Sequence, residues 1–206
     1  VIANGAGLPE ITQAGNFNFS FTAIAGEGDM NMTDLVNITN ELAKTKTKHR
    51  IIFFNGIHEW APVNTMHTAF AGWQLDAMSE KLIPVNQSFI ADYIKSSKES
   101  ITGNLQKNNF IRAEEECSLS VTMLDGLTGE VTWFKEKDAI IKNSSEYKRQ
   151  FKENQQILSK EQNIKEVYEQ QFQRGDLNYW TKTIDDITTK AKSSNAEGAM
   201  YKRLKA

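Results

Sequence analysis

Two short and strongly apolar runs mark the first part of the chain. Residues 19–25 and residues 50–54 are rich in apolar and β-favouring side chains, and glycine or polar residues flank both runs. The second run is apolar without alternation, which is typical of a strand covered on both sheet faces. Residues 1–4 have the composition of the end of another strand, and Gly5 and Gly7 belong to the loop expected after it.

The chain between the two apolar runs has the period of a helix. Leu35, Ile38 and Leu42 lie on one face of such a helix. Asn31 or Thr33 supplies a short polar side chain that suits its N-cap. A strand, a helix and a strand in this order predict a parallel pair joined by a right-handed crossover.

Helical spacing dominates the remainder of the chain. Beyond Pro62, a favourable residue in a first helical turn, apolar residues step by three and four along one expected face: Val63, Met66, Phe70, Trp73 and Ala77. No proline follows Pro84, which permits long helices. We expect an α/β segment over residues 1–84, holding about three strands from the C-terminal part of a doubly wound parallel sheet, and then an all-α array over residues 85–206. This second part resembles the helical hairpins of tetratricopeptide repeats.

Composition and charge exclude several classes of function. The 206 residues are 39% hydrophobic and 24% charged, with a formal net charge of −2, so the chain lacks the basic field that nucleic acid attracts. No apolar run reaches the ~18 residues of a membrane span. Cys117 is the single cysteine, which permits neither an internal disulfide nor a thiolate metal site, and we expect it to be buried. The three histidines are not spaced as metal ligands, and no metal or cofactor is expected.

One carboxylate and one imidazole follow the two apolar runs at matching positions. Asp29 lies in a Gly-Glu-Gly-Asp-Met-Asn-Met loop after the first run, and His58 lies in a Gly-Ile-His-Glu-Trp-Ala-Pro loop after the second. The carboxyl ends of neighbouring parallel strands meet at one edge of a sheet, so we expect the two side chains to be close together. A buried carboxylate fixes the tautomer of an imidazole and stabilises its protonated form, which is the arrangement that a general base requires.

These two loops resemble those of the α/β-hydrolase family and are similar to its dienelactone-hydrolase, esterase and peptidase members. The resemblance implies a serine hydrolase of bacterial type that cleaves small esters or, as a second choice, peptides, with His58 as the general base and Asp29 as the acid that orients it. The family order is Ser, acid, His, yet neither a Gly-x-Ser-x-Gly elbow nor an oxyanion loop occurs in the sequence. We therefore expect the chain to be an inactive C-terminal fragment whose serine precedes residue 1.

Other interpretations of the same residues stay open. In one alternative, the sole role of Asp29 is to place a favourable negative charge at the N-terminus of the helix that follows it. In another, His58 is an ordinary turn residue. Glu27 can replace Asp29 as the acid, while Glu59 is either a modulator of His58 or a solvated side chain. A hypothesis from another class makes the chain a noncatalytic scaffold whose helical half binds a protein partner.

The fragment hypothesis has structural and cellular consequences. Without preceding strands, residues 1–4 form an open sheet edge beside an apolar patch. Because the chain does not begin with Met, its compartment stays open between the cytoplasm and export. His49 is expected to be exposed in a polar connection, and His67 to lie off the apolar stripe of its helix.

Overall fold

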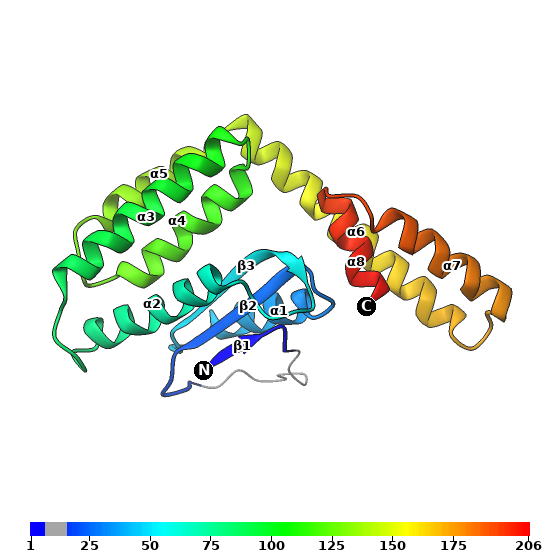
Figure 1. The fold of residues 1–206 in the computed structure, drawn as a ribbon, viewed down its shortest axis with the longest axis horizontal. Helices are drawn as coiled ribbons and strands as arrows, with labels where there is room; N and C mark the ends of the chain where they lie inside the picture. The colour runs from blue at the N-terminus through cyan, green and yellow to red at the C-terminus, as the bar shows by residue number, and fades with distance from the viewer. Residues whose placement is uncertain (7–15) are drawn as a thin grey trace. The chain divides into compact units, whose positions relative to one another are not determined.

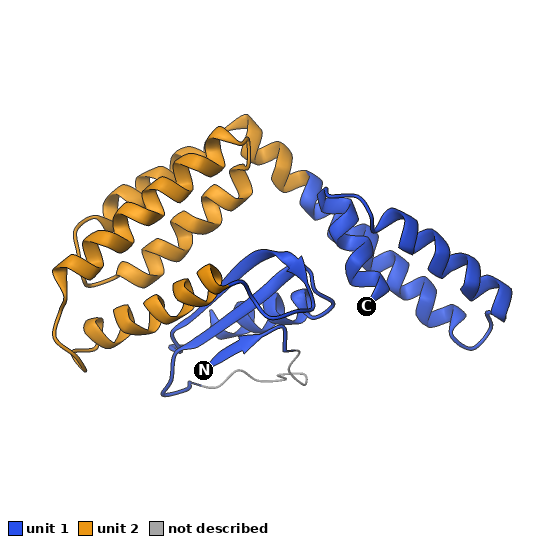
Figure 2. Ribbon diagram, in the orientation of Figure 1, with its two compact units in different colours: residues 1–62, 153–206 blue, residues 63–152 orange. Residues whose placement is uncertain are grey.

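A computed structural model of the protein describes residues 1–6 and 16–206 (Figure 1). The loop predicted at Gly5 and Gly7 therefore lies partly outside the described residues. Two compact units share the described chain: Val1–Pro62 with Glu153–Ala206 form the first, and Val63–Lys152 form the second (Figure 2). The domain boundary predicted at residue 84 stays a prediction.

The first unit contains a parallel sheet of three strands in the order β1-β2-β3 (Figure 1). β1 is Ile2–Asn4, β2 is Phe21–Gly28 and β3 is His49–Ile57. The central strand pairs in parallel with both neighbours. The predicted α/β class, followed by a mainly helical region, is confirmed. β1 is an edge strand of this sheet, as predicted, and the apolar patch beside it stays a prediction.

Helix α1, Met32–Leu42, packs on one face of the sheet. Its predicted apolar face is confirmed, because Leu35, Ile38 and Leu42 are buried against side chains of all three strands. Complete burial of one such side chain stabilises the folded state by roughly 1.5 to 3 kcal/mol relative to leaving it exposed. Asn31 is the N-cap residue, as predicted, but its side chain makes no cap hydrogen bond with the helix.

Burial along the strands differs between the centre and the edge of the sheet. β2 is buried along nearly its whole length, with Ala23 and Ile24 on opposite faces and both fully buried. In β3, buried and half-buried residues alternate, so the expected complete cover of this strand is wrong. A strand at a sheet edge has a neighbour on one side alone, which leaves more of its side chains open to solvent.

Three helices of the C-terminal region pack on one another. α6 is Ser145–Gln171, α7 is Leu177–Lys190 and α8 is Ala196–Lys205. Their shared core is formed by apolar and aromatic side chains: Ile157, Ile164, Tyr168, Ile187, Ala191, Met200, Tyr201 and Leu204. α8 also contacts β2, so this helical group and the sheet belong to one unit.

The second unit consists of helices. α2 is Val63–Ser79, α3 is Gln87–Gln106, α4 is Phe110–Leu124 and α5 is Val131–Asn143, and α4 contacts each of the other three. Cys117 is buried on α4, as predicted. Burial and then the nearby carboxylate of Asp138 raise the pKa of this thiol to about 12, so it is not a reactive thiolate at neutral pH.

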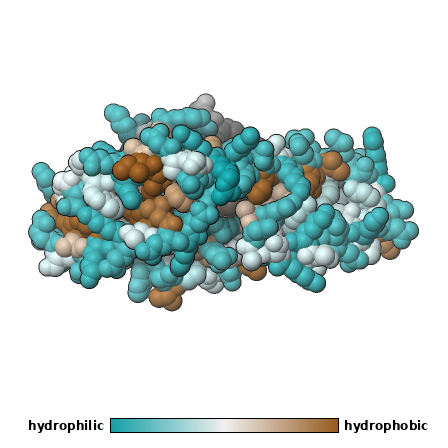
Figure 3. All heavy atoms as spheres, turned by 90° about the horizontal axis from the view of Figure 1, so that it is seen from above, coloured by the Kyte–Doolittle hydropathy of each residue, from teal (hydrophilic) through white to brown (hydrophobic). Residues whose placement is uncertain are grey.

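The buried face of α2 differs from the predicted apolar stripe. Val63 is 72% exposed and Phe70 is 50% exposed, whereas Ala69, Gly72 and Leu75 are buried. The buried face of α2 therefore includes small residues in place of the larger side chains of the predicted stripe. The face of the molecule in Figure 3 is mostly hydrophilic, with hydrophobic areas between the hydrophilic ones.

A buried ion pair joins α6 and α8. Oε2 of Glu161 accepts hydrogen bonds from Nε and Nη2 of Arg203 at 2.9 and 2.5 Å, and Oε1 lies 3.0 Å from Nζ of Lys165. Burial acts to raise the pKa of Glu161. The hydrogen bonds and charges of Arg203 and Lys165 outweigh burial and hold the pKa of this carboxyl below its ordinary value.

This pair predicts how stability depends on pH. Because folding lowers the pKa of Glu161, its stabilisation is complete above the ordinary value of 4.5 and is lost as pH falls through the lower folded value. Glu161→Gln leaves the Arg203 guanidinium buried without its carboxylate, at a cost on the order of 3 to 5 kcal/mol near neutral pH. Urea unfolding at neutral and acidic pH should show that Glu161→Gln has a lower free energy of unfolding than the wild type at neutral pH. On acidification, the free energy of unfolding of the variant should fall by less than that of the wild type.

The matched control is Glu41→Gln, because Glu41 pairs with Lys44 at the surface, where their side chains are 42% and 68% exposed. This change should alter the free energy of unfolding by less than about 1 kcal/mol. Equal stabilities of the two Gln variants at neutral pH would contradict the assigned role of the buried pair.

Candidate active site

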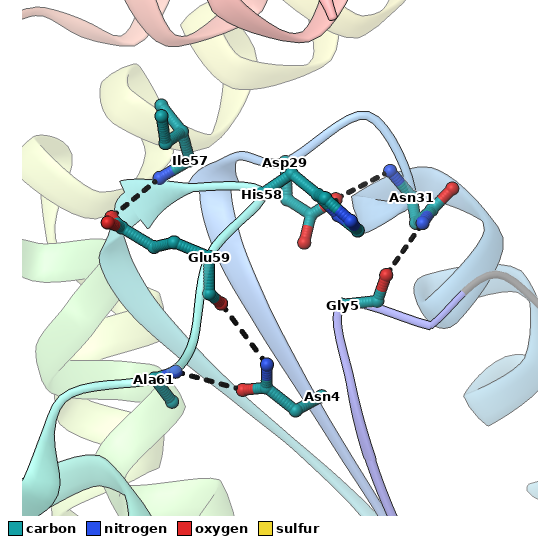
Figure 4. A network of polar contacts seen from close by, with 8 residues as sticks. All are labelled: Asn4, Gly5, Asp29, Asn31, Ile57, His58, Glu59 and Ala61. Carbon is teal, nitrogen blue, oxygen red and sulfur yellow. Dashed lines mark hydrogen bonds and ion pairs between the residues drawn. The ribbon is translucent and has the colours of Figure 1, made fainter.

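The carboxyl ends of β2 and β3 bring Asp29 and His58 together. Each residue directly follows its strand, and the parallel pairing of the strands places both loops at the same edge of the sheet (Figure 4). Nδ1 of His58 lies 3.1 Å from Oδ1 of Asp29, within hydrogen-bond distance. This edge is where open α/β sheets bind their ligands.

The two side chains differ in their contact with solvent. That of Asp29 is 1% exposed, whereas that of His58 is 49% exposed. A carboxylate can only accept a hydrogen bond, so a hydrogen bond between these two atoms requires the hydrogen on Nδ1 of His58. Nε2 is then the ring nitrogen that can take a proton from another group and return it.

Asp29 also starts the helix that follows it. The backbone N–H of Asn31 donates to Oδ1 of Asp29 at 2.9 Å, and the N–H of Met32 donates to the Asp29 carbonyl at 3.0 Å. The first of these contacts is an Asx turn, in which a side chain replaces a backbone acceptor. One carboxylate oxygen therefore serves both the helix start and the imidazole, and Asp29 is the candidate acid that lies against His58.

Gly5 packs against this pair at the end of β1. Its φ is +58°, and a Cβ added there would lie 2.7 Å from Oδ2 of Asp29 and 3.3 Å from Nδ1 of His58. Both the backbone conformation and the lack of space therefore require glycine. Among the described residues, Oδ2 of Asp29 is buried without a hydrogen-bond partner.

Two asparagines hold the surrounding loops: Asn4, which no sequence pattern singled out, and Asn31, which was expected only as a helix cap. Asn4 donates from Nδ2 to the Glu59 carbonyl and accepts at Oδ1 from the Ala61 N–H, each at 3.1 Å (Figure 4). Asn31 donates from Nδ2 to the Gly5 carbonyl at 2.6 Å. The position of Asn4 at the end of a strand was the available signal, because a short amide there can satisfy the backbone groups of a neighbouring loop.

Glu59 closes the turn that carries His58. Its Oε1 accepts from the Ile57 N–H at 3.2 Å, and the residue is exposed. Of the other histidines, His49 is half-buried rather than exposed as predicted, with Nδ1 lying 2.8 Å from the Thr47 carbonyl oxygen. The reason is that β3 already begins at His49. His67 is exposed on α2.

A hollow of about 550 Å³ lies elsewhere in the first unit, among α6, α7 and α8. Lys160 and Lys190 approach the ring of Tyr201 from 5.5 and 5.1 Å. Glu197 and Asp186 already pair with these two lysines. The two lysines at the hollow therefore already have acidic partners. None of the residues that line the hollow belongs to the sheet or to the loops of Asp29 and His58.

Within residues 1–6 and 16–206, no group of three or more His, Cys, Asp or Glu side chains is placed to hold a metal ion. Over the same residues, every helix is too short or too polar to cross a membrane. Comparisons of the chain with protein-family models, with curated proteins and with solved structures find no match in any of the three.

The packing around Gly5 gives a prediction for this site. Gly5→Ala places a side chain in a left-handed backbone conformation and against the Asp29 carboxylate, which should cost roughly 1 to 3 kcal/mol of folding free energy. Gly129→Ala is the control, since a Cβ there meets nothing within 4 Å. Urea unfolding of both variants measures the difference, and an unchanged midpoint for Gly5→Ala would disprove the predicted clash.

Proposed function

We propose that Asp29 and His58 are the acid and the general base of a serine hydrolase of the α/β-hydrolase family. The observation that carries this proposal is the 3.1 Å contact between two residues that follow successive parallel strands. The motif wording and the order of acid before histidine agree with it. Because the sequence contains no Gly-x-Ser-x-Gly elbow, the proposal places the nucleophile outside these 206 residues, in a longer protein.

The proposed reaction is acyl transfer from a small carboxylic ester to water. Nε2 of His58 takes the proton of the serine hydroxyl as it attacks the ester carbonyl, and returns that proton to the leaving alcohol. The same nitrogen then activates the water that hydrolyses the acyl-enzyme. Asp29 holds Nδ1 throughout, and its burial makes this contact stronger than it would be in water.

A further support is that β1 is an edge strand over the described residues. β1 pairs with β2 on one side, and Val1 at its start is 54% exposed. An unpaired strand edge is a template for another strand. In the proposed longer protein, the strand that carries the serine elbow pairs with this edge of β1 and brings the nucleophile towards His58.

The test is an esterase assay of the longest natural open reading frame that contains these residues. Hydrolysis of short p-nitrophenyl esters should fall roughly 10⁴-fold in kcat for His58→Ala and by a similar factor for Asp29→Asn, since loss of either removes the base or its tautomer. His67→Ala is the matched control, because His67 is exposed on α2 and should leave kcat unchanged. The isolated 206-residue chain should show no activity.

Two results would count against the hydrolase. One is a reading frame that carries no serine elbow, and the other is a His58→Ala protein as active as the wild type. Either outcome would favour the alternative that the chain is a noncatalytic module that binds a protein partner through its helices.

A further inference from the structure

One arginine from the C-terminal helix reaches the strand end that carries Asp29. Arg203 of α8 is 6% exposed, and its Nη1 donates to the carbonyl of Glu27. The same Nη1 lies 3.9 Å from Sδ of Met32. The guanidinium therefore contacts residues on both sides of Asp29, from a position 176 residues beyond Glu27 in the chain.

The contact falls where the sheet is irregular. The pairing of β2 with β3 shifts register between Gly26 and Gly28, because Gly26 pairs with Phe54 and Gly28 with Ile57. β3 therefore has one residue more than β2 in this stretch, and the resulting bulge places Asn55 and Gly56 opposite Glu27, directly before the acid loop. A bulge interrupts the hydrogen-bond ladder and redirects the side chains that follow it. Arg203 supplies a donor to the carbonyl within this interruption.

The end of β2 is packed tightly on two sides. A Cβ added at Gly26 would lie 2.6 Å from the carbonyl oxygen of Ile57, and one at Gly28 would lie 3.0 Å from Cβ of Lys202. The acid loop is thus confined between the end of β3 and α8. A shift of this strand end would move Asp29 relative to His58, because Asp29 directly follows Gly28.

We propose that Arg203 is a positioning residue for the Asp29–His58 pair. Glu161 holds the guanidinium through two hydrogen bonds, and the guanidinium holds the Glu27 carbonyl, so that α6 and α8 together determine where the end of β2 places the Asp29 carboxylate. This assigns a role in the site to the helices of the C-terminal region. Its catalytic consequence rests on the proposed hydrolase function, whereas its structural content does not.

The shape of the arginine side chain is essential to this role. A guanidinium presents its donors in a rigid planar fork, which can bind a carboxylate on one side and a carbonyl on another. A lysine at the same position keeps a cation for Glu161 but has a single nitrogen on a flexible stem. Arg203→Lys therefore separates the charge of the residue from its geometry.

The experiment uses ¹⁵N NMR of the His58 ring in the 206-residue chain, in alkaline solution. In the wild type, the contact with Asp29 selects the tautomer with hydrogen on Nδ1. Asp29→Asn supplies the reference for its loss. Arg203→Lys and Arg203→Met should both lower the population of the Nδ1–H tautomer to below half of the wild-type value. The circular dichroism spectra of both variants should show that the chain remains folded.

The matched control is Arg112→Met, because Arg112 forms an ion pair with Glu115 on α4 in the second unit. It should leave the His58 tautomer unchanged. If Arg203→Met does not fold, Arg203→Lys decides, since it keeps the charge beside Glu161. A folded Arg203→Lys chain with the wild-type tautomer would overturn the proposal.

The tautomer measurement needs neither a serine nor turnover, so it can succeed where the proposed function fails. If both proposals hold, Arg203→Lys in the longer, active protein should lower kcat by about 10²-fold, as expected for a misplaced catalytic group. KM should change little, because Arg203 contacts the loop of the acid and not the substrate. A tautomer change without any esterase in the longer protein would retain the positioning role and reject the hydrolase.

Discussion

The parallel pairing of β2 with both neighbours is the constraint on which the candidate site depends. Because all three strands run in one direction, their carboxyl ends lie at one edge, and the residues that follow them converge there. Asp29 comes from the central strand, His58 from one neighbour, and Asn4 with Gly5 from the other. Each strand thus contributes one part of the candidate site: the Asp29 carboxylate, the His58 imidazole, or the residues that pack against them and hold their loops.

Gly5 and Asn4 support the Asp29–His58 pair by close backbone packing and by hydrogen bonds, and not by the bulk of large side chains. Gly5 lies against the carboxylate and the imidazole at distances that exclude a Cβ, while Asn4 ties the loop of His58 to the end of β1. A buried carboxylate is costly unless it is hydrogen-bonded. The partners of Oδ1 reduce this cost, and the glycine permits the geometry in which they reach it.

The helices of the C-terminal region also contact the strand that precedes Asp29, through Arg203. The ion pair of Glu161 and Arg203 is a poor source of net stability compared with an apolar pair of the same size, because two charges must lose their hydration. The pair instead orients a rigid donor, because it directs Nη1 of Arg203 at the carbonyl of Glu27, which lies opposite the bulge in β3.

Local sequence patterns were sufficient to predict the order of strands and helices, and with it the edge at which Asp29 and His58 meet, because strand and helix periods are properties of neighbouring residues. The buried face of α2 was predicted wrongly, since small residues such as Ala69 and Gly72 acquire their role only from the surface that packs on them. Tertiary structure alone decided the contact of Arg203 with Glu27 and that of Asn4 with Ala61. These partners are 176 and 57 residues apart, and no local period relates them.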